Sequence, residues 1–182
     1  MNQATKIVVT RMDVMPNIDT LMLRPFEPQD DLLLVEYLND PQVIHYLSSR
    51  IPSPYKAEDA KWWINKGSRS GFIRAITVNG ELAGCVGAEV GQHEYQHCAQ
   101  VGYWLAKGFW GHGFATQALS LLVDELKQIT QVIRLQASVY EGNQSSAKVL
   151  EKCGFVQQGY FPKAVYKNDR FYHEVVYGRT IA

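Results

Sequence analysis

Several features that mark other classes of protein are missing from this chain of 182 residues. Basic and acidic side chains number 18 each, so the basic excess typical of proteins that bind nucleic-acid phosphates is absent. No apolar run approaches the ~20 residues that a membrane-spanning helix needs. The first residues also lack the apolar stretch of a signal peptide. We therefore expect no direct nucleic-acid partner and no membrane partner.

Cysteine is scarce as well, with Cys85, Cys98 and Cys153 as the only three and no CxxC spacing among them. An odd number without paired spacing favours free, buried thiols in a reducing compartment, so we expect the cytoplasm. His93, His97 and Cys98 lie close together in the sequence, but zinc sites need a fourth ligand and none is near. No metal site is expected.

The chain also lacks internal repeats, low-complexity tracts and linkers rich in proline, glycine or serine. Its length suits one domain with a substantial core. We expect a single domain over residues 20–182, preceded by an N-terminal extension over 1–19 with one short strand at 6–10.

The pattern of apolar residues predicts an α+β fold. A strand is expected at 20–26, and helices at 29–40 and 56–67. Two apolar segments at 72–78 and 81–90 flank Asn79-Gly80, which is the strongest short signal for a β-hairpin. With a third strand at 98–106, these segments predict an antiparallel meander.

The second half of the chain alternates helices and strands. Residues 114–128 place apolar side chains on one helical face, namely Ala115, Leu119, Leu122, Val123 and Leu126. A half-buried strand is expected at 131–140, where apolar residues alternate with polar ones: Ile133, Leu135, Ala137 and Val139. Asn143 suits the N-cap of a further helix that ends at Gly154. Strands near 156–161 and 171–179 complete a mostly antiparallel sheet with one strand–helix–strand crossover over 98–140.

The stretch FWGHGFAT places Gly111 and Gly113 between an expected strand and an expected helix. Glycine there indicates a positive φ or a close approach of the backbone to another group. Main-chain amides at the start of a helix form an anion site, for which phosphate is the usual ligand. A dinucleotide site is disfavoured, because Ala115 and Thr116 stand where GxGxxG has its third glycine, and no Walker motif exists. A turn without a ligand stays open.

The glycine turn is part of a longer pattern. GYWLAKGFWGHGFATQAL, then a strand, then NQSSAKVLEKCGF resembles the GNAT superfamily of acetyl-CoA-dependent N-acetyltransferases. The branch it is most similar to acetylates the N-terminal alanine or serine amine of ribosomal proteins. In that branch WGxGxAT opens the central helix and NxxSxxxxEKxGF opens the next one. LRPFEPQDD and YHEVVYG also fit, so the resemblance covers residues 20–180. It implies a GNAT fold, with a mixed, mostly antiparallel sheet and helices on both faces.

The resemblance further implies acetyl-CoA as the cofactor. The amides of the glycine turn would hold its pyrophosphate, and the strand before the turn would hydrogen-bond its pantetheine arm. Trp110 departs from the superfamily, which more often has glutamine or arginine there. The residues implied in binding are Trp104, Leu105, Trp110, Gly111, His112, Gly113, Phe114, Ala115, Thr116, Asn143 and Ser146.

Catalytic roles are also implied by the resemblance. Ser146 would donate a proton to the departing thiolate, with Tyr140 and Tyr103 as alternative donors. The acceptor ammonium must lose a proton before its nitrogen can attack, so a general base is needed. Glu89 is the candidate, and the histidines at 93, 97 and 112 stay open as alternatives.

The sequence thus predicts an N-acetyltransferase that acts by direct attack of an amine on the thioester, without a covalent enzyme intermediate. By analogy with the ribosomal branch, the acceptor is the α-amine of a protein N-terminus. A small-molecule acceptor (polyamine, amino acid or antibiotic), a catalytically weak coenzyme-A-binding regulator and a ligand-free interaction domain stay open. So does a homodimer formed through the aromatic N-terminal helices.

Overall fold

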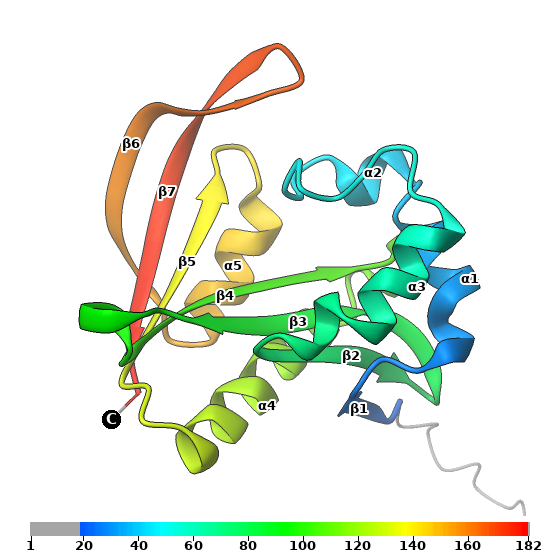
Figure 1. The fold of residues 1–182 in the computed structure, drawn as a ribbon. Helices are drawn as coiled ribbons and strands as arrows, with labels where there is room; N and C mark the ends of the chain where they lie inside the picture. Colours follow the sequence, from blue (N-terminus) through cyan, green and yellow to red (C-terminus); the bar gives the residue numbers. More distant parts are fainter. Residues whose placement is uncertain (1–18, 182) are drawn as a thin grey trace, which may run out of the picture.

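The computed structural model describes residues 19–181, so the short strand expected at 6–10 lies outside the described residues. One seven-stranded sheet forms the centre, in the order β1-β2-β3-β4-β5-β7-β6 (Figure 1). All neighbouring strands are antiparallel except β4 and β5. The α+β prediction with one parallel crossover is confirmed.

The predicted meander of three strands is confirmed, and β1 adds to it as an antiparallel edge strand beside β2. The four strands are β1 (Leu21–Arg24), β2 (Phe72–Val78), β3 (Glu81–Val90) and β4 (Cys98–Leu105). Asn79 and Gly80 join β2 to β3 with φ values of 52° and 86°, as the turn of a two-residue hairpin requires. The β2–β3 register shifts by one residue between Ile76 and Thr77, because Ala83 of β3 is an extra residue opposite them. The side chains of Ile76 and Thr77 are buried.

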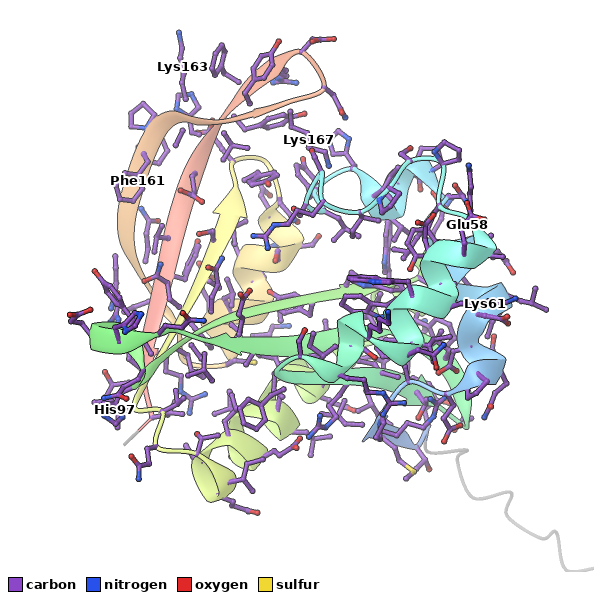
Figure 2. All side chains as sticks on the ribbon, viewed as in Figure 1. Glu58, Lys61, His97, Phe161, Lys163 and Lys167 are labelled. Atoms are coloured by element: carbon purple, nitrogen blue, oxygen red, sulfur yellow. The ribbon has the colours of Figure 1, made fainter. Side chains whose placement is uncertain are left out.

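One face of the meander is covered by the helices between β1 and β2. They are α1 (Asp31–Tyr37) and α3 (Ala57–Asn65), and the short α2 (Pro41–Ile44) lies between them in the chain. Ala60 and Ile64 of α3 are buried in a core that reaches Cys85 of β3. Figure 2 shows Glu58 and Lys61 extending from α3 away from the sheet. The helix is therefore amphipathic, and its apolar side packs on the sheet.

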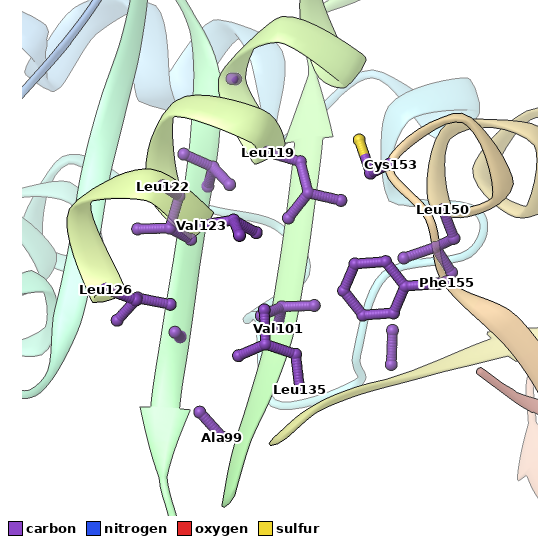
Figure 3. Packing of buried hydrophobic residues seen from close by; sticks show 14 of the residues in the cluster. Ala99, Val101, Leu119, Leu122, Val123, Leu126, Leu135, Leu150, Cys153 and Phe155 are labelled. Atoms are coloured by element: carbon purple, nitrogen blue, oxygen red, sulfur yellow. The ribbon is translucent and has the colours of Figure 1, made fainter. Parts of the chain in front are cut away.

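The opposite face carries α4 (Phe114–Ile129) and α5 (Gln144–Lys152). Figure 3 shows the side chains of α4 packed against β4, β5 (Arg134–Tyr140) and the segment after α5. The buried residues include Leu119, Leu122, Val123, Leu126, Val101, Leu135, Leu150 and Phe155. Helices on both faces are thus confirmed. β5 begins later than predicted, and Ile133 precedes it with 49% of its surface exposed.

The last two strands are longer than the sequence pattern predicts. β6 (Val156–Lys167) and β7 (Arg170–Thr180) form a hairpin that projects beyond the rest of the sheet (Figure 1). Every residue of β6 is exposed or half-buried. A projecting hairpin has no core on either side to impose alternation, so its outer part gives a weak sequence signal. In the part of the chain described, no helix is both long and apolar enough to cross a bilayer.

Candidate active site

The glycine turn leads directly into α4. Gly111 and Gly113 have φ values of 83° and 81°, and Gly113 is the N-cap residue of the helix. A Cβ atom at either position would meet nothing within 4 Å. Glycine is therefore required here for its left-handed backbone conformation, and the space beside the turn is open.

The main-chain amides of this turn have no acceptor within the described residues. Trp110 N donates to Lys107 O and Gln117 N donates to Gly113 O, but no hydrogen bond is formed by the amides of 111–116 in between. The positive end of the α4 dipole adds to their field, and no acidic side chain stands in the first turn. Free amides at a helix N-terminus are a built anion site, so this segment fits the pyrophosphate of coenzyme A.

Aromatic packing stabilises the glycine turn before α4. Phe114 is buried, and its ring contacts those of Phe109 and His112, with centroid separations of 6.4 and 5.5 Å. The indole Nε1 of Trp110 donates to the carbonyl of Leu105 at 2.8 Å. Trp110 thus fastens the turn to the end of β4 through its side chain.

Next to the turn, β4 and β5 separate. The strands pair only from Cys98–Arg134 to Gln100–Gln136, although β4 continues to Leu105 and β5 to Tyr140. Beyond the Gln100–Gln136 pair, the main-chain N–H and C=O groups on the facing edges of β4 and β5 no longer pair with each other across the gap. Such edges need partners, and the two amides of a pantetheine arm have the matching chemistry. Trp104 and Leu105 lie on the β4 side of this gap.

The start of α5 lies across the gap from β4. The side chain of Asn143 accepts a hydrogen bond from Ser146 N at 3.2 Å, which confirms the predicted N-cap. The hydroxyl oxygen of Tyr103 lies 2.9 Å from both the carbonyl and the Oγ of Ser146. The structure therefore brings Asn143, Ser146 and Tyr103 together.

Burial raises the pKa of Tyr103 well above its ordinary value, so the phenol keeps its proton at neutral pH. It has one proton for two acceptors. If that proton goes to Ser146 Oγ, the serine hydroxyl remains free to donate elsewhere. Sequence reasoning named Tyr103 as an alternative donor but not its contact with Ser146, because the two residues are 43 positions apart.

The other predicted catalytic residues lie on the opposite face of the sheet. Glu89 is exposed on β3, opposite Gln100 of β4 in the strand register. Gln100 is opposite Gln136 of β5, and this is the last pair before β4 and β5 separate. Tyr140 is half-buried at the far end of β5. Burial raises its pKa, and the charge of Glu174, its partner on β7, adds to the effect.

The three histidines are not brought together. His97 Nδ1 lies 2.9 Å from Gln131 O, just beyond the C-terminus of α4. Since α4 has 16 residues, it separates His97 from the glycine turn by about 24 Å. His93 is exposed in the loop before β4. Only His112 belongs to the turn itself.

Comparison with known proteins agrees with this geometry. Residues 20–156 match the family model described as acetyltransferase (GNAT) domain. The chain is 29% identical over 146 residues to p20, an uncharacterised N-acetyltransferase of Bacillus licheniformis, covering 78% of this chain and 82% of the relative. It is 30% identical over 83 residues to the ribosomal-protein-serine acetyltransferase of Escherichia coli, covering 46% of each.

A similar fold is found in the solved structure of RimL, the ribosomal L7/L12 α-N-protein acetyltransferase in complex with coenzyme A. The TM-score is 0.76 at 20% identity, covering 88% of this chain and 94% of the other. The chain therefore belongs to the GNAT acetyltransferase family. It is an acyltransferase, and acetyl-CoA is its co-substrate.

Proposed function

We propose that this acetyltransferase transfers the acetyl group of acetyl-CoA to the α-amine at the N-terminus of a protein, with ribosomal proteins as the first class to test. The cradle of unpaired amides over 111–116, next to the gap between β4 and β5, is the observation that carries the acyltransfer part. The names of two similar proteins, both ribosomal-protein acetyltransferases, support the choice of acceptor. Three free cysteines support a reducing compartment, and we place the reaction in the cytoplasm.

Acetyl-CoA supplies an acetyl group activated as a thioester, and the residues of the chain bind and orient it. The amides of 111–116 hold the pyrophosphate at the N-terminus of α4. The free edges of β4 and β5, including Trp104 and Leu105, bind the pantetheine arm, and Asn143 contacts it from the start of α5. These contacts place the thioester in the gap between β4 and β5, where groups on both faces of the sheet can reach it.

Glu89 and Ser146 approach the gap from opposite faces. Glu89 lies on the face that α1 and α3 cover in part, where it accepts a proton from the acceptor ammonium. The neutral nitrogen attacks the thioester carbonyl carbon, loses a second proton to solvent as the amide forms, and the carbon–sulfur bond breaks. Ser146, on the face of α4 and α5, donates a proton to the sulfur, and Tyr103 donates in turn to Ser146. Tyr140 is the alternative donor.

The test is thiol release from acetyl-CoA with a panel of amines: tetrapeptide amides that begin with serine or alanine, spermidine, and free lysine. Acetylation of the peptide α-amine, located by mass spectrometry, supports the proposal. Preference for spermidine or lysine would contradict the acceptor class but keep the acyltransfer. Binding of acetyl-CoA without turnover of any amine would favour a coenzyme-A-binding regulator instead.

A further inference from the structure

The last residue of β6, Lys167, makes a set of contacts that the acyltransfer site does not explain. Its ammonium donates to three main-chain carbonyls, those of Ile44, His45 and Leu47, at 2.9, 2.8 and 2.5 Å. An ammonium has three N–H donors, so each donor has one acceptor. The bonds join the β6–β7 hairpin to the end of α2, at least 120 positions away in the sequence.

Residues 44–50, here called the roof segment, extend from this lysine toward the end of β5. A Cβ atom on Gly142 would lie 3.1 Å from the hydroxyl of Tyr46, so the roof segment touches the turn between β5 and α5. The charge of Arg50 acts on the pKa of Tyr140 and lowers it against the effect of burial. The roof segment therefore spans from the hairpin to the end of β5 (Figure 2).

The roof segment has little else to hold it. Four residues of α2 are too few to form a stable helix on their own. Other hydrogen bonds within 41–50 are local, such as Leu47 N to Ile44 O and Arg50 N to Ser48 Oγ. Over the described part of the chain, each hydrogen bond that ties 41–50 to a distant segment comes from Lys167. Apolar burial of Val43 and packing of Leu47 add to the attachment.

We propose that Lys167 is a positioning residue for the amine acceptor: it fixes the roof segment beside Tyr140, on the side from which the amine reaches the thioester. The inference rests on the proposed acyltransfer and extends it. Lys167 touches neither the amide cradle nor Ser146, so its loss changes how the acceptor is held and leaves acetyl-CoA binding and proton donation intact.

The test compares Lys167→Met with Lys163→Met. Both lysines are on β6, but Lys163 is exposed and extends away from the molecule, whereas Lys167 points to the roof segment (Figure 2). With a serine-initiated tetrapeptide as acceptor, Lys167→Met should raise the acceptor KM about tenfold, since it removes three charge-assisted hydrogen bonds. The kcat and the KM for acetyl-CoA should change less than twofold. Lys163→Met should match the wild type, and Lys167→Arg should recover at least part of the acceptor KM.

Hydrogen exchange provides a readout independent of turnover. Amides of 44–50 should exchange faster in Lys167→Met than in Lys163→Met, while those of α4 stay unchanged. The proposal is overturned if the acceptor KM of Lys167→Met equals that of Lys163→Met, or if kcat and both KM values change together. If the wild type acetylates no amine of the panel, the proposed function fails and the acceptor role fails with it. In that case, the hydrogen-exchange comparison still decides whether Lys167 holds the roof segment in place.

Discussion

Two turns of this molecule share an unusual backbone but differ in what their polar groups do. The hairpin turn has Asn79 and Gly80 at φ 52° and 86°, and the turn before α4 has Gly111 and Gly113 at 83° and 81°. In both, a Cβ on the glycine would stand in open space. At the hairpin, Asn79 N donates to Thr20 O at 2.9 Å, and the Asn79 side chain bonds Thr20 N and Asp19. The amides of 111–116 have no such partners among the described residues.

The difference shows where function is to be sought. Glycine at positive φ is required by both turns, so it describes only their conformation. At the hairpin turn, the main-chain and side-chain donors of Asn79 are both paired, and the turn closes the β2–β3 connection. The turn before α4 leaves its donors free at the positive end of a long helix, where an anion satisfies them. A run of unpaired donors, and not glycine as such, marks the candidate binding site.

The largest effect is expected at the donor beside the cradle. Ser146→Ala should lower kcat about tenfold, less than is usual for a proton donor, because a thiol is already a good leaving group. Acetyl-CoA binding should weaken much less than kcat falls, since the amides of 111–116 are untouched. Steady-state kinetics with binding calorimetry measure both. A kcat equal to that of the wild type would remove Ser146 from the reaction and favour Tyr140.

Tyr103 should assist the reaction by donating its proton to Ser146, and it should stay protonated from neutral pH up to pH 10. Burial raises its pKa above the ordinary 10.0, so kcat should show no fall from neutral pH up to pH 10 that depends on this residue. Tyr103→Phe should lower kcat by a smaller factor than Ser146→Ala and leave the shape of the pH profile unchanged. Because the folded-state pKa is raised, its contribution to the free energy of unfolding is present below pH 10 and is lost above it. A falling limb below pH 10 that disappears in Tyr103→Phe would contradict this.

Two asparagines form the next comparison. Asn79 closes the hairpin turn and Asn143 caps α5, each through its side chain. Either one replaced by alanine should lower the free energy of unfolding by about 1 kcal/mol. Only Asn143→Ala should also weaken acetyl-CoA binding, because only Asn143 stands at the gap. Denaturant unfolding and calorimetry separate the two effects, and equal acetyl-CoA affinities would refute the cofactor role of Asn143.

The smallest effect is expected at the most accessible thiol. Cys98 is half-buried at the start of β4, at the end of the strand away from the cradle, while Cys85 and Cys153 are buried. Direct attack needs no covalent enzyme intermediate, so Cys98→Ser should keep wild-type turnover. A Cys98→Ser protein that binds acetyl-CoA but is inactive would point to an acetyl-cysteine step.

The local parts of this fold follow from the sequence. Asn79-Gly80, the apolar face of α4 and the Asn143 cap each depend on neighbouring residues, and all three are confirmed. The separation of β4 from β5 after the Gln100–Gln136 pair is a feature of tertiary strand pairing, which no short sequence pattern encodes. The contact of Tyr103 with Ser146 and that of Lys167 with residues 44–47 join distant segments. A single sequence carries no signal for such pairs, and the assigned roles of the site residues stay predictions.

The central claim is that the amides of 111–116 bind acetyl-CoA. The direct test is thermal unfolding with and without acetyl-CoA for the wild type, Gly111→Asp and the matched control Gly80→Asp. Aspartate is among the residues that tolerate a left-handed backbone, and it places a negative charge in each turn. At a hundredfold excess over Kd, the ligand should stabilise the wild type and Gly80→Asp by about 2.7 kcal/mol and leave Gly111→Asp unshifted. An equal shift in Gly111→Asp, or none in the wild type, would contradict the claim.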